Sequence, residues 1–212
     1  MFNVRMKFKK SGSSAYISHL DLMKTLQRSF VRSGLPLKYS QGFNPHIYLS
    51  ILAPLSTGFE SEYELCDFDF DTDVYPENVL EKLNGAFPPG IEAVAVYEQK
   101  NQPKNIAYCV YEIVYPEGDA QKMEEYFKTD ITIIKESKRQ SREVKINDYI
   151  KNIVFEKQEN GVKCTAVLDL GNDPLNPSYI SKALKDGGLL PQQVVPKYKR
   201  ISLLDRSFKP FE

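Results

Sequence analysis

The sequence has no long hydrophobic run, and its first residues lack the features of a secretory leader. No window of about 18 residues is apolar and free of charge, which is the length that a membrane-spanning helix needs. The first ten residues, MFNVRMKFKK, contain neither an apolar core segment nor a small-residue cleavage site. We therefore expect a cytoplasmic protein that does not associate with a membrane.

Cysteine is also scarce. Cys66, Cys109 and Cys164 are odd in number and far apart in the sequence, which argues against a disulfide framework. No C-x-x-C pair or three-cysteine cluster motif is present, so the clustered thiolates that a zinc or iron–sulfur site needs are missing. We expect three small buried hydrophobic residues, and neither a metal ion nor another cofactor.

The composition is that of a globular protein. Of the 212 residues, 42% are hydrophobic and 26% are charged, and this length fits one or two domains. The formal net charge of zero conceals an asymmetry, because residues 1–50 carry a net charge of +7 and residues 51–100 a net charge of −9. Such a distribution indicates either a partner of opposite charge or two solvated faces of one domain.

The first hundred residues alternate between strand-like and helix-like patterns. Phe2, Val4, Met6 and Phe8 alternate with charged residues, which predicts a half-buried strand over residues 2–9. A helix follows Ser18 and ends before Gly34. Further strands are predicted at 37–39, 47–52, 61–71 and 91–96, and a second helix runs from Pro76 to Phe87. The order strand, helix, strand, strand, helix, strand predicts a ferredoxin-like unit over residues 1–100.

The pattern restarts after a polar connector at 101–105. Strands are predicted at 107–115, 131–136, 143–146, 153–157, 162–170 and 194–204, and helices at 119–128 and from Pro177 to Leu184. The helices again follow the first strand and precede the last. We therefore predict an α+β protein with antiparallel sheets, built from tandem ferredoxin-like (split βαβ) units over residues 1–100 and 106–212.

Residues 16–61 contain unusually specific sequence motifs. They are YISHLDLM at 16–23, GLP at 34–36 and YSQGFNPH at 39–46, extended by Pro54-Leu55, Gly58 and Glu60-Ser61. This segment, called the signature segment below, closely resembles that of the radical-SAM-linked family, a bacterial domain family of unknown function. In that family the domain is fused behind a radical S-adenosylmethionine module or occurs as a separate small protein. Without a three-cysteine motif, this chain resembles the stand-alone form, and the resemblance implies a radical SAM protein as a partner.

Three residues of the signature segment are candidates for catalysis. His19 and His46 are the only histidines, and a neutral imidazole acts as a general base near pH 7. Asp21 lies two residues after His19, but positions i and i+2 point apart on a helix. The alternative roles are structural and are favoured: Asp21 completes a capping box with Ser18, and the histidines bond to the backbone or anchor a loop.

Other residues of the signature segment are candidates for nucleic-acid binding. Gln41 and Asn44 carry amides that read base edges, and Phe43 offers a stacking face, although a core plug is an equal alternative for Phe43. Lys24, Arg28 and Arg32 are spaced by four residues, which aligns them as a basic stripe along one helix flank. Arg5, Lys7, Lys38 and the basic clusters at 135–145 and 197–206 are expected to extend this surface.

Three functions follow from these features. The chain is an RNA-binding accessory module of an RNA-modification system, an enzyme that uses His19, Asp21 and His46, or an interaction domain that docks on a radical SAM enzyme. We expect residues 16–61 to build one concave surface, where the N-terminus of the first helix meets the loop at 40–46. We also expect the stripe to be exposed and not paired with the acidic run from Glu60 to Asp73.

Overall fold

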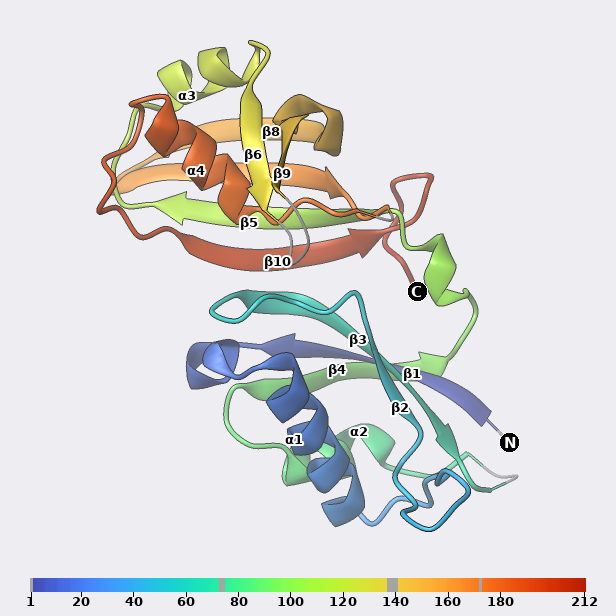
Figure 1. Ribbon diagram of the computed structural model, residues 1–212. Coiled ribbons are helices and arrows are strands. Elements are labelled where there is room, and N and C mark those ends of the chain that lie inside the picture. The colour runs from blue at the N-terminus through green and yellow to red at the C-terminus, as the bar shows by residue number, and fades with distance from the viewer. Residues whose placement is uncertain (1, 73–74, 137–140, 172) are drawn as a thin grey trace. The chain divides into compact units, whose positions relative to one another are not determined.

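The computed structural model describes residues 2–72, 75–136, 141–171 and 173–212, and it shows an α+β protein with largely antiparallel strands (Figure 1). Contacts between residues divide the chain into two compact units. The N-terminal unit comprises Met1–Pro103 with Glu212, and the C-terminal unit comprises Lys104–Phe211.

The N-terminal unit has four strands and two α-helices among its described residues. They are β1 (Phe2–Lys10), the 3₁₀ helix η1 (Gly12–Tyr16), α1 (His19–Arg32), β2 (Leu49–Leu52), β3 (Glu60–Phe70), α2 (Val79–Ala86) and β4 (Ile91–Glu98). The strands lie in the order β4-β1-β3-β2, and each neighbouring pair is antiparallel. Both helices cover one face of these strands (Figure 1).

The core of this unit follows from the two periodicities of its sequence. Val4, Met6 and Phe8 alternate on β1 and point toward the helices, where Leu26 and Phe30 of α1 meet them. The Phe30 ring packs edge-on against that of Phe68 at 4.8 Å between centroids. The sequence left the two faces of β3 unassigned. The structure places Cys66, Phe68 and Phe70 in the helix-facing core.

The other face of β1 differs from the prediction of a half-buried strand. Arg5 is fully buried and forms a bidentate ion pair with Asp67, with Nε–Oδ1 and Nη2–Oδ2 distances of 2.7 and 2.9 Å. On the same face as Phe8, Lys10 at the end of β1 is also buried, and its Nζ reaches the carbonyl oxygen of Ala15. Period-two alternation predicts which residues share a face but not whether that face meets water, so the expectation that Arg5 contributes to an exposed basic surface is wrong.

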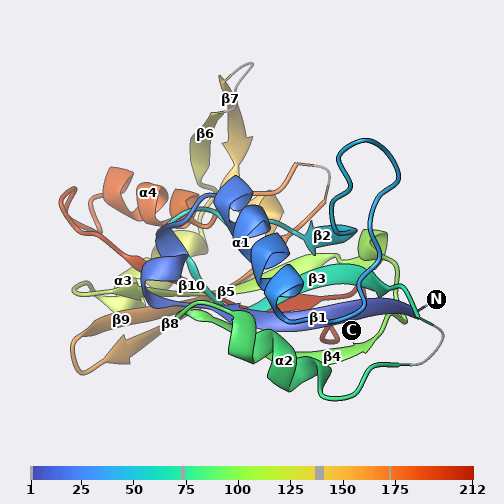
Figure 2. The same cartoon turned by 90° about the horizontal axis from the view of Figure 1, so that it is seen from below.

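Smaller differences concern the segment before β2. Residues 37–39 form isolated bridges, Leu37 with Phe70 and Tyr39 with Ile47, instead of a strand. The strand predicted at 47–52 is limited to Leu49–Leu52. The long connection from α1 to β2 extends away from the helices and strands of its unit (Figure 2). It is this connection that carries the 40–46 loop.

The C-terminal unit repeats the order of elements and adds a hairpin. Its elements are β5 (Tyr108–Tyr115), α3 (Ala120–Phe127), β6 (Thr132–Glu136), β7 (Ser141–Lys145), η3 (Ile146–Tyr149), β8 (Ile150–Gln158), β9 (Gly161–Asp169), α4 (Ser178–Asp186) and β10 (Lys197–Leu204), preceded by η2 (Pro103–Asn105). Four strands lie in the order β10-β5-β9-β8 with antiparallel neighbours, and β6 pairs with β7 as a separate hairpin.

Gly161 begins β9 directly after Glu159-Asn160, the two-residue turn that joins β8 to β9. Its φ angle is +113°, and a Cβ atom there would collide with the carbonyl oxygen of Tyr115. Glycine is therefore required at this position both by the backbone conformation and by the close approach of β5.

Candidate nucleic-acid interface

The N-terminus of α1 has the predicted capping box. Ser18 Oγ accepts a hydrogen bond from the Asp21 backbone N–H at 3.1 Å and donates one to Asp21 Oδ2 at 2.7 Å. The Asp21 carboxylate is thus engaged in the cap, whereas the His19 side chain is exposed. This geometry assigns Asp21 a structural role.

The loop at 40–46 is closed by its own hydrogen bonds. Ser40 N–H donates to the His46 carbonyl at 2.8 Å, and His46 N–H donates to Ser40 Oγ at 3.1 Å. Ser40 Oγ also lies 3.0 Å from His46 Nδ1, which is 3.4 Å from the carbonyl oxygen of Asn44. His46 therefore anchors the loop, as its structural alternative predicted.

His19 and His46 lie at opposite ends of α1. The helix begins beside the start of β3, where Gly58 N–H donates to the Ala15 carbonyl. The loop lies beside the end of β3, where Lys38 N–H donates to the Asp69 carbonyl. Fourteen residues make α1 about 21 Å long, and Figure 1 shows the loop at the end opposite to its start. The expected single concave surface is wrong, because the loop meets the C-terminal end of α1.

Phe43 is fully exposed at the tip of this loop, so it is not a core plug. Gln41 and Asn44 beside it are also exposed. Tyr39 and Tyr48 flank the loop with exposed rings, and Lys38 Nζ lies 5.6 Å from the Tyr48 ring centroid. Three aromatic rings and two amides therefore face solvent within ten residues, next to the half-buried Lys38.

The basic stripe is exposed along its whole length, but its members differ. Arg32 Nη2 donates to the Ala86 carbonyl at 2.7 Å and to Ser29 Oγ at 3.0 Å, so it fastens α1 to the end of α2. Among the described residues, Lys24 and Arg28 have no ion-pair partner. They are the members of the stripe with cationic groups directed to solvent alone.

The acidic run pairs elsewhere, over the part that the structure describes. Asp67 binds Arg5, Glu62 lies 3.2 Å from Lys9, and Asp69 lies 3.6 Å from Lys38. Asp73 lies outside the described residues. Within that limit, no carboxylate of the run neutralises the basic stripe.

Lys7 is also less available for contact with a polyanion than its sequence position indicates. Its Nζ stacks over the Tyr63 ring at 3.8 Å from the centroid, and burial lowers its pKa. Arg5 and Lys7 therefore both leave the basic surface that the sequence predicted around the helix and the loop.

Exposed apolar side chains gather in the signature segment. Of the thirteen large hydrophobic residues that are exposed in the described part of the chain, six lie between residues 16 and 48: Tyr16, Leu20, Val31, Tyr39, Phe43 and Tyr48. Sequence reasoning identified only Phe43 among them. The exposure of Leu20 and Val31 was predictable, because both lie off the helical stripe of buried residues on α1. This density of exposed apolar groups is typical of an interaction surface.

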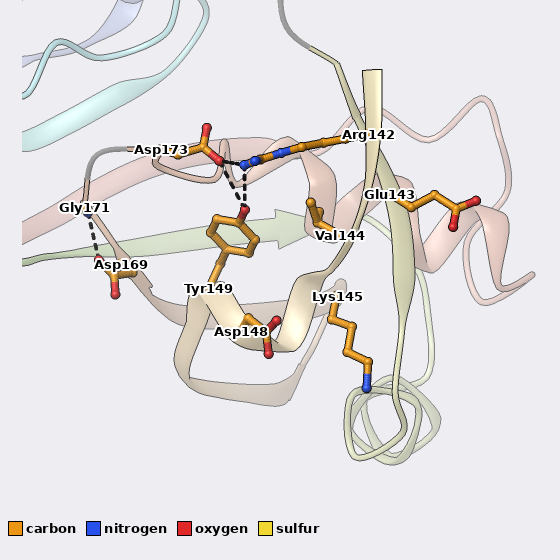
Figure 3. Close-up of a pocket in the computed structure, with 9 residues that line it drawn as sticks. All are labelled: Arg142, Glu143, Val144, Lys145, Asp148, Tyr149, Asp169, Gly171 and Asp173. Atoms are coloured by element: carbon orange, nitrogen blue, oxygen red, sulfur yellow. Dashed lines mark hydrogen bonds and ion pairs between the residues drawn. The ribbon is translucent and has the colours of Figure 1, made fainter. Parts of the chain in front are cut away.

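A second feature is an open pocket of about 620 Å³ in the C-terminal unit (Figure 3). Residues from β7, η3, the end of β9 and the segment after it line this pocket: Arg142, Glu143, Val144, Lys145, Asp148, Tyr149, Asp169, Gly171 and Asp173. Asp173 accepts hydrogen bonds from both Arg142 and Tyr149. Figure 3 shows these three side chains converging on one wall.

The cations of this region are already paired. Lys135 Nζ lies 2.7 Å from Asp173 Oδ1, and Lys145 Nζ lies 3.0 Å from Asp130 Oδ2. Burial lowers the pKa of Lys135, and the nearby Arg142 acts in the same direction. The predicted basic cluster at 135–145 is thus matched by carboxylates in its described part, while residues 137–140 lie outside it. The pocket therefore lacks the excess positive charge that a polyanion requires.

No group of three or more metal-ligating side chains occurs in the described part of the chain. None of the helices there has both the length and the apolar composition needed to cross a bilayer.

Comparison with protein families identifies the family of this chain. A family model described as "uncharacterized protein conserved in bacteria (DUF2344)" matches residues 3–175. The chain belongs to this family. A search of curated proteins finds no match. Membership in DUF2344 agrees with a bacterial family of unknown function, whereas the link to radical SAM proteins stays a prediction.

Proposed function

We propose that this DUF2344 protein binds single-stranded RNA through the surface formed by α1 and the loop at 38–48. The observation that carries the proposal is Phe43, a fully exposed ring at the tip of a loop that its own hydrogen bonds hold closed. An exposed ring on a preorganised loop offers a base a stacking face at little entropic cost. Tyr39 and Tyr48 offer further faces.

The polar groups around these rings fit the same ligand. Gln41 and Asn44 present amides that both donate and accept, as the edges of unpaired bases require. Lys24 and Arg28 on α1 are directed to solvent and suit phosphate contacts, while Arg32 is the weaker candidate because Ala86 already binds it.

We also propose that both units are ferredoxin-like domains, covering residues 1–100 and 106–212. Support comes from the strand orders β4-β1-β3-β2 and β10-β5-β9-β8, which place corresponding strands alike. The β6–β7 hairpin is then an insertion between α3 and β8 of the second domain. Fold analogy by itself says little about function, so the RNA-binding proposal rests on the side chains.

The resemblance of the signature segment supports a role beside a cytoplasmic radical SAM enzyme that modifies RNA. In this proposal the partner supplies the iron–sulfur chemistry, and this chain, whose three cysteines are buried, supplies RNA affinity. The enzyme hypothesis is weakened, because His19 and His46 lie at opposite ends of α1 and Asp21 serves the cap.

A separate observation supports a second function, the docking of a protein partner. Tyr16, Leu20 and Val31 are exposed on and before α1, which favours docking of a protein partner, such as the radical SAM enzyme. Docking of this kind needs no salt-dependent affinity for RNA, so a titration separates the two functions.

The test is a binding titration of the whole chain with a labelled single-stranded RNA of about 12 nucleotides. We expect salt-dependent binding that Phe43→Ala weakens by about tenfold and Phe43→Tyr preserves. Val195→Ala, which removes another exposed apolar side chain, is the matched control and should bind like the wild type. Absence of salt-dependent binding by the wild type would contradict the proposal and favour the docking function.

A further inference from the structure

The turn after β10 combines three unusual features in one residue. Phe208 has a φ angle of +60°, a left-handed conformation that bulky side chains rarely adopt. The residue is 52% exposed. It is also stacked on Tyr108, with 4.4 Å between centroids and 6° between the ring planes. A glycine or asparagine would serve this backbone conformation better and would expose no apolar ring.

The surroundings of Phe208 hold it in this conformation. Asp205 N–H donates to the Lys209 carbonyl, and Phe208 N–H donates to the Asp205 carbonyl. Asp205 Oδ1 accepts from the backbone N–H groups of Ser207 and Lys209 at 2.7 and 3.0 Å. Leu204 pairs with Pro210 at the base of the turn. The strained residue is therefore fixed by at least four hydrogen bonds, as strained residues at binding sites commonly are.

The parallel stack covers one face of the Phe208 ring with Tyr108, while about half of the residue's surface stays exposed. Arg206 and Lys209 flank it in the sequence, and both are exposed with no carboxylate partner among the described residues. The Asp205 carboxylate is occupied with the backbone of the turn. A flat apolar face between two cations suits a nucleobase with its neighbouring phosphates.

We infer that Phe208 is a second stacking platform, at which the C-terminal unit binds a nucleobase of the single-stranded RNA, with Arg206 and Lys209 at the adjacent phosphates. This inference rests on the proposed RNA-binding function and deepens it. Of the residues in this site, the sequence prediction included only Arg206, as the last member of the basic cluster at 197–206. Neither the ring stack nor the φ angle is visible in the residue types.

The test compares Phe208→Asn and Phe208→Tyr in the whole chain, with a labelled uridine oligonucleotide of about 12 nucleotides as the probe. Asparagine tolerates the left-handed conformation without the ring, so we expect about tenfold weaker binding with an unchanged thermal midpoint. Tyrosine retains the ring and should bind like the wild type. Val195→Asn removes an exposed apolar side chain of the same unit and should have no effect.

Photocrosslinking of the wild type to the same oligonucleotide gives a readout that needs no variant. We expect an adduct on the peptide that contains Phe208. If Phe43→Ala weakens binding while Phe208→Asn binds like the wild type, and no adduct forms at Phe208, the second platform is overturned and the proposed function stands. A wild type that binds no RNA overturns both.

Discussion

At the residue scale, the buried Arg5–Asp67 pair has the largest predicted energetic effect. Arg5 is fully buried, and Asp67 accepts two hydrogen bonds from it and a third from Gln99 Nε2 at 2.7 Å. Replacing Asp67 with alanine leaves a buried guanidinium without its carboxylate, which costs about 3–5 kcal/mol. We therefore expect Asp67→Ala to lower the free energy of unfolding by that amount in urea titrations.

The matched control is Glu62→Ala, which removes an exposed carboxylate of the same strand that pairs with Lys9. Exposed pairs contribute about 0–1 kcal/mol. Equal losses for the two variants would show that Asp67 does not compensate a buried charge.

Residue types predicted some of these roles and missed others. The capping box of Ser18 and Asp21 was predictable, because it depends on neighbours three residues apart. The burial of Arg5 was not predictable, because it depends on what covers the second face of β1. Nor did the sequence decide between a core and a surface position for Phe43, since a ring suits both.

At the element scale, the basic stripe of α1 contains one structural cation, Arg32, and two cations without a partner among the described residues, Lys24 and Arg28. Arg32 bonds to the last turn of α2, whereas Arg28, one turn earlier, has no described partner. We expect Arg32→Ala to lower the thermal midpoint through a loss of about 1 kcal/mol, and Arg28→Ala to leave it unchanged. Equal thermal midpoints for the two variants would contradict a structural role of Arg32.

The boundaries of most elements followed from hydrophobic period and caps, with errors of one to three residues. The start of α1 and the ends of β8 and β9 lie where alternation and turn residues indicated. The strand predicted at 37–39 is reduced to isolated bridges, because Leu37 pairs with Phe70 of β3 and Tyr39 pairs with Ile47, and local sequence does not show how far such pairing extends. The same contacts bring the loop to the far end of α1 from His19.

At the scale of the whole molecule, buried tyrosines predict how stability depends on pH. Burial raises the pKa of Tyr115, Tyr97 and Tyr198 above the ordinary value of about 10. These phenols stay protonated in the folded state where the unfolded chain ionises, so stability is full below about pH 10 and falls as the pH rises above it.

Tyr115→Phe isolates one of these contributions. Tyr115 is buried, and its hydroxyl lies 3.1 Å from Ser181 Oγ. We expect the variant to lose stability less steeply than the wild type above about pH 10. Because the sequence contains no tryptophan, the absorbance of tyrosinate reports the ionisation of its thirteen tyrosines without overlap from indole. Identical pH profiles would mean that Tyr115 ionises alike in the folded and unfolded states.

The central claim is that the N-terminal unit binds RNA through α1 and its adjoining loop, and the salt dependence of binding tests it most directly. The measurement is the slope of log K against log salt between about 50 and 200 mM for the wild type and for Lys24→Ala/Arg28→Ala. Each lost phosphate contact on a single strand should reduce the slope by about 0.7, so the double variant should lose about 1.4. Lys122→Ala, an exposed lysine of α3 that lies 3.8 Å from Asp119, is the control and should keep the full slope. A wild type without salt-dependent binding, or a double variant with an unchanged slope, would contradict the account.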